Sequence, residues 1–490
     1  MERRLQDHLD RRRREGTLRT LMPLPLPKPQ HHEVGATQYD VQPGSTSAPA
    51  LIDFASNDYL GLARCREQHA FVQSAYDKLF TPDSHNIDLY PPMLGATGSR
   101  LLSGDSLLAR SLELKLASIH QRPSALLFNS GYDANLSVLS SLPYREDDDA
   151  IVMDELVHNS LIMGVRLGRL RKERVFSFRH NDVVDLKRVL DEVSLSSSPL
   201  ASILIVVESV YSMDGDIAPL HNILDLAQVV GARVVVDEAH GLGVYGSTNL
   251  DNLEVIDYEN NAPSDGDDGR TIQDVPDNSS KGGVGVLAAL NLESHPALLC
   301  SIHTFGKAAG CHGAVVAGSS TLISYLVNYA RPFVYSTSLP PHSLVSIQQA
   351  YESMMGEVGE QRRKKVFRLV RIFREEMSVA LRMNFPKNTE FELLPSPSPI
   401  QAIVVPGNDE CISVCKYLRN EGNFDVYPIR SPTVAKGKER IRIVLHSHNH
   451  ADQVRELSKV LVLSLLRLIN NGHWRVLLLG CLTLASPKRV

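Results

Sequence analysis

From residue 51 onward, short apolar runs alternate with helical patterns along the chain. Runs such as Ile203–Glu208 and 232–237 have the length and β-branched content of buried strands, and Leu220–Val230 between them has the apolar spacing of a helix. Strands that are buried on both faces and joined by helices form parallel sheets. The alternation therefore predicts an α/β fold with a mostly parallel central sheet flanked by helices. Further strands are expected at 124–129, 151–154, 298–303 and 314–317.

Composition changes along the chain suggest how it is organised. Prolines between residues 23 and 29 end a charged N-terminal helix, and Asp, Asn, Gly and Ser dominate residues 249–291, as in a flexible surface insertion. A long amphipathic helix is expected over 344–383. The predicted regions are an N-terminal helix and connector (1–50), a large domain (51–343), a smaller C-terminal α/β domain (344–470) and a tail (471–490).

The bulk composition is that of an enzyme with a large core. The chain has 490 residues, of which 43% are hydrophobic, and its net charge of -5 gives no general basis for binding nucleic acid. The apolar stretch 476–485 is about half the length of a membrane span, so none is expected. The six cysteines lack paired metal-ligand spacing, and no metal is predicted. The cytoplasm is the expected compartment, while a mitochondrial or peroxisomal location stays open.

Two motifs after the strand 232–237 match other enzyme classes. The run Asp237-Glu238-Ala239-His240 matches a helicase acidic box, but no Gly-Lys in the chain is followed by the Ser or Thr of a phosphate-binding loop. Residues 241–246 match G-x-G-x-x-G, but the acid precedes these glycines, whereas in a dinucleotide fold it follows them. Neither nucleotide hydrolysis nor dinucleotide binding is therefore predicted.

Lys307 and Asp237 together point to a specific chemistry. Lys307 lies in a loop of small residues after a strand, and Asp237 ends another strand. Pyridoxal phosphate needs an amine to hold its aldehyde and a carboxylate to keep its pyridine nitrogen protonated. The pair therefore predicts pyridoxal phosphate as the cofactor.

Three other segments fit the same cofactor. Gly131 and Tyr132 follow a strand and precede a helix expected from Ala134, so their amides are placed to hold a phosphate. His158 lies just past a strand, where its ring can stack on a pyridine, and the polar loop 208–216 lies at a strand's carboxyl end. Taken alone, each also fits a structural turn or a surface histidine.

An ordered series of segments resembles the α-oxoamine synthases, which are pyridoxal-phosphate acyltransferases of aminotransferase fold type I. The similarity extends over roughly residues 8–470. This resemblance implies a fold type I transferase. The matching segments are 54–62, 98–104, 129–135, 211–216, 335–341 and the two motifs around Asp237 and Lys307.

The resemblance also implies roles for individual residues. Lys307 would bind the cofactor covalently and shuttle the proton of the amino acid, Asp237 would pair with the pyridine nitrogen, and His158 would stack on the ring. Thr337 matches a position that reaches the phosphate of a neighbouring subunit, which implies a homodimer with shared active sites. The remaining matches are Gly131, Tyr132, Ser212, His240 and Thr304 for the cofactor, and Arg19, Asn57, Arg430 and Thr433 for the substrate.

The implied reaction is a decarboxylative condensation of an amino acid with an acyl-CoA to an aminoketone. The segments around Arg100 and Arg430 look most like the biotin-pathway branch, which implies L-alanine and pimeloyl-CoA. The chain departs from the family at Ala109, where members often carry a histidine. A relative that uses another acyl thioester and a non-catalytic partner subunit are the alternatives.

Overall fold

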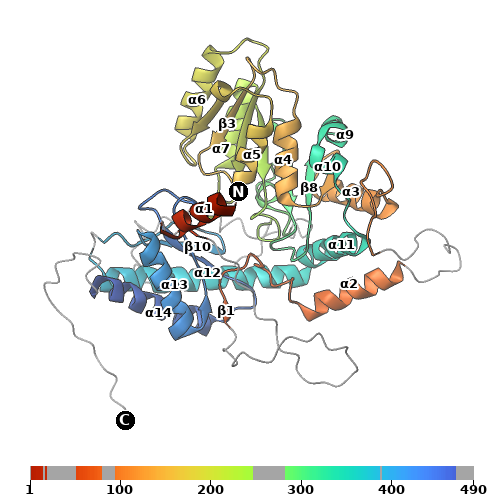
Figure 1. The fold of residues 1–490 in the computed structure, drawn as a ribbon. Helices are drawn as coiled ribbons and strands as arrows, with labels where there is room; N and C mark the ends of the chain where they lie inside the picture. The colour runs from red at the N-terminus through yellow and green to blue at the C-terminus, as the bar shows by residue number, and fades with distance from the viewer. Residues whose placement is uncertain are drawn as a thin grey trace, which may run out of the picture.

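A computed structural model describes residues 2–14, 17–18, 51–79, 94–246, 282–386 and 389–470 of the chain. Arg19, the proline-rich connector, residues 249–281 of the predicted insertion and the tail 471–490 lie outside the described residues. In Figure 1, a large sheet and its helices form one part, and a smaller α/β unit lies beside the long helix α12 (Glu357–Asn384).

The central sheet has seven strands in the order β2-β8-β7-β6-β5-β3-β4. The pairs along β7-β6-β5-β3-β4 are parallel, and β8 alone runs against its neighbours β2 and β7. The predicted mostly parallel sheet is therefore confirmed. The strands are β2 (Ser124–Phe128), β3 (Ala150–Asp154), β4 (Val175–Phe178), β5 (Ile203–Glu208), β6 (Arg233–Asp237), β7 (Leu298–Thr304) and β8 (Ala314–Gly318).

Every residue of β3, β5 and β8 is buried, which shows that both faces of this sheet are covered. Each buried Val, Leu or Ile side chain contributes roughly 1.5–3 kcal/mol relative to exposure, so the central strands dominate the stability of this part. The helices of this part are α2 (Arg66–Lys78), α3 (Leu107–Ile119), α4 (Gly131–Ser141), α5 (Asn159–Leu167), α6 (Val183–Leu195), α7 (Leu220–Val230), α8 (Val286–Ala289), α9 (Ser320–Tyr329) and α10 (Arg331–Tyr335).

The smaller unit has its own sheet and its own hydrophobic core. Its four strands are antiparallel in the order β12-β13-β10-β9, and α14 packs against both α12 and α13 (Figure 1). The strand β1 (Ile52–Asp53) pairs with β11 (Phe424–Asp425) and so ties the segment after residue 51 to this unit. The other elements are β9 (Glu392–Leu393), β10 (Ile400–Val404), β12 (Tyr427–Ile429), β13 (Arg440–Val444), α13 (Asn408–Gly422) and α14 (Ala451–Asn470).

The single helix predicted over 344–383 is wrong, because the chain forms two helices there. α11 (Pro341–Met355) ends at Gly356, which has extended backbone, and α12 begins at the next residue. The buried Arg363 donates from Nη1 to the Met354 carbonyl at 2.6 Å. This guanidinium takes the place of a helical N–H at that carbonyl, so the interruption is stabilised by a contact that the hydrophobic pattern does not reveal.

Residues 282–289, which the composition assigns to a surface insertion, are buried. Val284 is 2% exposed, and all four residues of α8 (Val286–Ala289) are at most 2% exposed. The buried carboxylate of Glu238 accepts hydrogen bonds from the backbone of Val286 and Leu287, at 3.1 and 2.6 Å. The helix is thus held by a residue far away in sequence, and its short apolar run is hidden by the polar residues before it.

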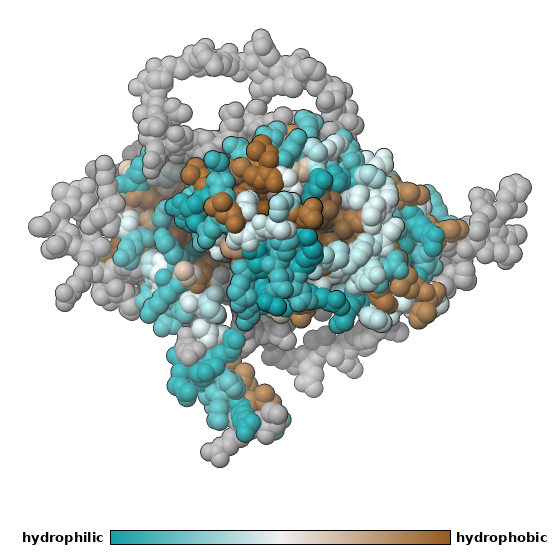
Figure 2. Space-filling view, turned by 90° about the horizontal axis from the view of Figure 1, so that it is seen from above, coloured by the Kyte–Doolittle hydropathy of each residue, from teal (hydrophilic) through white to brown (hydrophobic). Residues whose placement is uncertain are grey.

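The face drawn in Figure 2 is largely hydrophilic, with separate hydrophobic patches. Among the described residues, no helix combines the length and apolar composition needed to cross a membrane. The N-terminal helix α1 (Glu2–Arg14) is mostly exposed and ends in four arginines, as its predicted charged character implies.

Candidate active site

Polar residues gather at the carboxyl edge of the parallel strands. Glu208 ends β5, Asp237 ends β6 and Thr304 ends β7. Glu208 and Asp237 are register partners on neighbouring strands, so their side chains lie on the same face of the sheet. Because parallel strands end at one edge, residues almost a hundred positions apart meet there.

Lys307 lies in the loop between β7 and β8 and reaches this edge. Its Nζ is 2.7 Å from Nε2 of His240, and Nδ1 of His240 is 2.6 Å from the Tyr59 hydroxyl. Burial lowers the pKa of Lys307 to about 8, although the carboxylates of Asp237 and Glu208 act in the opposite direction. The amine is therefore closer to neutrality than an ordinary lysine at physiological pH.

The two carboxylates of this edge have different surroundings. Asp237 accepts from Asn135 Nδ2 at 2.7 Å and from the Ala239 N–H at 2.9 Å, so it is oriented on both oxygens. Glu208 accepts from the backbone N–H of His158. Burial, together with the nearby charge of Asp237, raises the pKa of Glu208 well above its usual value. Asp237, oriented on both oxygens at the end of β6, is thus the carboxylate placed to accept a pyridine N–H.

The start of α4 provides an anion-binding cradle. The helix begins at Gly131, three residues before the predicted start, and Ser130 caps it by accepting from the Asp133 N–H. Among the described contacts, no acceptor is found for the N–H groups of Gly131 and Tyr132. A Cβ on Gly131 would lie 2.8 Å from the Thr304 hydroxyl oxygen, so only glycine permits this approach. Two free amides and a hydroxyl at a helix N-terminus fit the phosphate of pyridoxal phosphate.

Three other predicted residues lie around this edge. His158 is exposed, precedes α5 and holds its Nδ1 2.7 Å from the Ser160 hydroxyl. Ser212 lies in the loop after β5, and Asn57 contacts the Tyr59 hydroxyl through its Oδ1 at 3.2 Å. The structure thus brings together Lys307, Asp237, His158, His240, Gly131, Tyr132, Thr304, Ser212 and Asn57.

For three other predicted residues, the described contacts are with other neighbours, and their roles stay predictions. Thr337 is exposed, and its carbonyl accepts from Asn129 Nδ2 at 2.8 Å. Arg430 and the exposed Thr433 form a turn after β12, in which the Thr433 N–H donates to the Arg430 carbonyl. In the same turn, the Ser431 N–H donates to Asn408 Oδ1 at 3.1 Å.

Arg442 is a site residue that the sequence reasoning missed. It lies on β13 of the smaller unit, and its Nε donates to the Ser212 carbonyl at 2.7 Å while Nη2 donates to Asn57 Oδ1 at 2.9 Å. Burial lowers the pKa of Arg442, and its charge in turn helps to lower the pKa of Lys307. The alternation of Arg440 and Arg442 with isoleucine in an apolar strand was the available signal, because it places both arginines on one face.

His180 forms a second polar junction near this edge. Its Nδ1 is 2.9 Å from Asp154 and its Nε2 is 2.7 Å from Asp216, and its ring meets Tyr211 edge-on at 4.4 Å. Burial lowers the pKa of His180, but the hydrogen bonds to both aspartates outweigh it and raise the pKa to about 10. The imidazolium therefore clamps the loop that carries Ser212.

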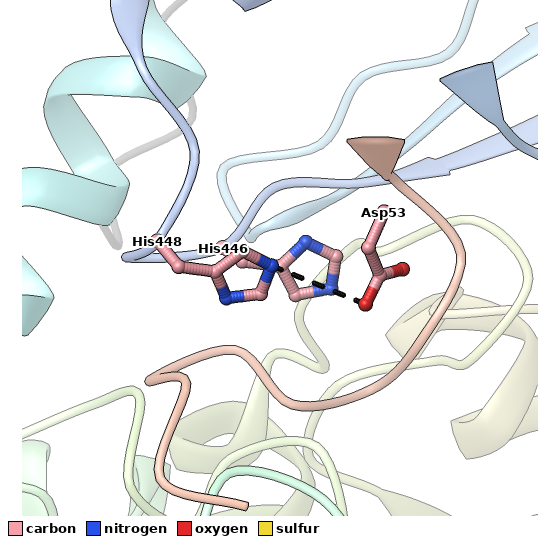
Figure 3. A group of neighbouring side chains, drawn as sticks. All are labelled: Asp53, His446 and His448. Atoms are coloured by element: carbon pink, nitrogen blue, oxygen red, sulfur yellow. Dashed lines mark ion pairs between the residues drawn. The ribbon is translucent and has the colours of Figure 1, made fainter. Parts of the chain in front are cut away.

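Two groups of possible metal ligands occur among the described residues, and the better defined one is shown in Figure 3. His446 and His448 stack with ring centres 4.6 Å apart and planes 14° from parallel. A bound metal needs ring nitrogens aimed at one point about 2.1 Å away, which stacked parallel rings do not provide. Asp53 is instead paired with Arg64 at 2.7 Å. His446 of the smaller unit has its Nε2 2.8 Å from the Ser56 carbonyl, so this group helps to hold the segment after β1 against that unit. The other group is His180, Asp214 and Asp216.

Known proteins resemble the chain in sequence over most of its length. Residues 49–461 match the family model of aminotransferases of class I and II. The 8-amino-7-oxononanoate synthase of Emericella nidulans is 34% identical over 415 residues, which are 82% of this chain and 86% of that protein. The enzyme of the same name from Marinobacter nauticus is 33% identical over 404 residues, covering 82% and 84%.

Solved structures show the same fold. The serine palmitoyltransferase of Sphingomonas wittichii superposes with a TM-score of 0.65 at 24% identity, covering 84% of this chain and 87% of that one. The 8-amino-7-oxononanoate synthase of Francisella tularensis superposes with a TM-score of 0.61 at 23% identity, covering 85% and 98%. The chain therefore belongs to the class I and II aminotransferases and, within them, to the α-oxoamine synthases, as its motifs predict.

Proposed function

We propose that the protein uses pyridoxal phosphate to condense L-alanine with pimeloyl-CoA, releasing carbon dioxide and CoA and forming 8-amino-7-oxononanoate. The relatives named for that product support the proposal, since they match more than four fifths of the chain. The observation that carries it is the buried amine of Lys307, held 2.7 Å from His240 beside Asp237 and Glu208.

The residues at the sheet edge would hold the cofactor. Lys307 would bind its aldehyde and Asp237 its pyridine nitrogen, while the start of α4 and Thr304 would receive the phosphate. His158 would lie against the ring, with Ser212 and His240 around it. When bound, the cofactor supplies an electron sink for the carbanion at the amino acid's α-carbon. Asp237 sustains that sink by keeping the pyridine nitrogen protonated, so its removal would weaken the carbanion's stabilisation.

Two side chains of the site act on the amino acid. Lys307 Nζ, once freed from the aldehyde, takes the α-proton, and its lowered pKa gives it the neutral form needed for this step. Arg442 is the half-buried arginine whose charge acts on Lys307, and its guanidinium would bind the carboxylate of the amino acid. Arg19, Arg430 and Thr433 stay predicted substrate contacts.

The proposal includes a homodimer. The loops 98–104 and 335–338 are joined by hydrogen bonds from Ser338 to Gly98 and Gly104. Together they expose Leu102 at 85% and Tyr335 at 82%, beside the exposed Thr337. Large apolar side chains so exposed are typical of a surface that another chain covers, and a second copy would bring Thr337 to its partner's site. A cytoplasmic location remains part of the proposal.

The decisive experiment is release of free CoA thiol from pimeloyl-CoA by the cofactor-loaded protein, with L-alanine, glycine and L-serine compared side by side. We expect release that depends on L-alanine, with the aminoketone identified by mass spectrometry. Release with another amino acid would assign a different branch of the family. Absence of release with all three, while another acyl-CoA does react, would overturn the choice of pimeloyl-CoA.

A further inference from the structure

A continuous chain of hydrogen bonds runs from Lys307 to Arg442. Lys307 Nζ lies 2.7 Å from His240 Nε2, and His240 Nδ1 lies 2.6 Å from the Tyr59 hydroxyl. The hydroxyl lies 3.2 Å from Asn57 Oδ1, which also accepts from Arg442 Nη2 at 2.9 Å. Tyr59 is the central member of this chain, and the sequence motifs gave it no role.

The two ends of the chain determine its direction. Arg442 can only donate, so the Asn57 side chain must present its oxygen to it. The same oxygen then accepts the Tyr59 hydroxyl proton, which leaves the Tyr59 oxygen free to accept from His240 Nδ1–H. With Nδ1 protonated, the neutral imidazole has its lone pair on Nε2, and this lone pair faces the ammonium of Lys307.

Burial makes each of these contacts necessary. Tyr59 is 1% exposed and His240 is 4% exposed, so water does not replace a missing partner. Burial, with the charges of Lys307 and Arg442, holds the pKa of His240 well below its usual range, which keeps the imidazole neutral. A neutral imidazole has one donor and one acceptor, and this arrangement uses both.

We propose that Tyr59 is a positioning residue, whose hydroxyl fixes the tautomer and orientation of His240 and thereby stabilises the ammonium form of Lys307. The inference rests on the proposed function only for its use in catalysis, because the contacts belong to the chain itself. In the reaction, this arrangement would set how readily Lys307 releases the proton that it has taken from the amino acid.

Other charges also act on Lys307 and must stay constant in a test. Asp237 and Glu208 favour its ammonium form, and Arg442 disfavours it. Lys307 itself helps to lower the pKa of His158. A variant that removes only the hydroxyl of Tyr59 leaves all four of these side chains unaltered. It also removes the contact of that hydroxyl with Arg442, which keeps its hydrogen bonds to Asn57 and to the Ser212 carbonyl.

The test is Tyr59→Phe in the full chain freed of cofactor, with the pH dependence of Lys307 acetylation by acetic anhydride followed by peptide mass spectrometry. Without the hydroxyl, the His240 Nδ1–H is buried without a partner when Nε2 accepts from Lys307. We expect the midpoint for Lys307 to fall by about one pH unit, because an unpartnered buried donor costs roughly that much.

Tyr245→Phe is the matched control. Tyr245 is also fully buried, but among the described residues its hydroxyl has no hydrogen-bond partner, so its removal should leave the Lys307 midpoint unchanged. Coincident profiles for Tyr59→Phe and the unaltered protein, or an equal shift in Tyr245→Phe, would refute the proposal.

A second variant covers the case in which Tyr59→Phe does not fold. If Tyr59→Phe fails to fold by circular dichroism, Asn57→Ala removes the acceptor of the Tyr59 proton and should shift the Lys307 midpoint in the same direction by less. An unchanged Lys307 midpoint in folded Asn57→Ala would contradict the proposed role of this chain of hydrogen bonds. The labelling needs no turnover, so failure of CoA release with an intact midpoint shift would count against the proposed function alone.

Discussion

Two histidines near the same sheet edge differ in protonation state. His240 lies between Lys307 and Tyr59, and burial with nearby positive charge keeps its pKa well below the usual range. His180 lies between Asp154 and Asp216, whose hydrogen bonds overcome burial and raise its pKa to about 10. The same side chain is thus neutral in one buried setting and positive in the other.

The difference shows that partners, and not burial alone, decide the role of each histidine. A neutral imidazole between a lysine and a tyrosine can orient a reactive amine. An imidazolium between two aspartates is an ion-pair clamp, which holds the loop after β5 in place. The first region is organised for chemistry and the second for rigidity, and each can be altered separately.

The largest effect should come from Lys307→Ala, which removes the charge that faces His240 and the base of the reaction. We expect CoA release to fall by at least about 10³-fold, since a positioned acid–base group alone contributes roughly 10²–10⁴-fold. Lys115→Ala is the control, because Lys115 forms an exposed ion pair with Glu352 and should keep full activity. Activity of Lys307→Ala near that of the control would remove Lys307 from the mechanism.

His180→Gln breaks the clamp on the other side of the comparison. Leaving the buried Asp154 and the half-buried Asp216 without their cation should cost about 3 kcal/mol in the free energy of urea unfolding at neutral pH. Because the folded pKa of about 10 lies above the unfolded value, the stabilisation is full below pH ~6.5 and is lost as pH rises through about 10.

The stability difference between His180→Gln and the unaltered protein should therefore shrink from pH 7 to 10. The exposed His221 provides a control, since His221→Gln should change stability by less than about 0.5 kcal/mol. A stability difference that stays constant with pH would mean that His180 is not charged.

Arg442→Lys tests the arginine that lies beside the neutral histidine. A lysine keeps the charge but loses the paired geometry of the guanidinium, so KM for L-alanine should rise about 10–100-fold with a smaller change in kcat. The same KM measurement on Arg430→Lys compares the two candidate carboxylate ligands directly. A larger rise in Arg430→Lys would favour the residue chosen from sequence over the one chosen from structure.

Gly131→Ala should give the smallest effect. The added Cβ would meet the Thr304 hydroxyl at 2.8 Å, so the phosphate cradle must open and the Kd for pyridoxal phosphate should rise about tenfold, ~1.4 kcal/mol. Gly95→Ala, whose Cβ would meet nothing within 4 Å, should bind the cofactor normally. Equal affinities in the two variants, measured by absorbance titration, would argue against the cradle.

Local sequence was sufficient for six of the seven strands of the large sheet, all but β4, and it pointed to Lys307 and Asp237 in the candidate site. β5 and α7 coincide with their predicted bounds, and Lys307 and Asp237 were found because each follows an apolar strand. Arg442 was missed because its place depends on packing between two units, with its Asn57 partner 385 positions away. His180 was missed for a similar reason, since its charge depends on Asp154 and Asp216 from other segments.

The most direct test of the central claim is borohydride reduction of the cofactor-loaded protein, followed by proteolysis and mass spectrometry of the labelled peptide. We predict one pyridoxyl group, attached to the Lys307 side chain. A label on any other lysine, with Lys307 unmodified, would contradict the account of this site.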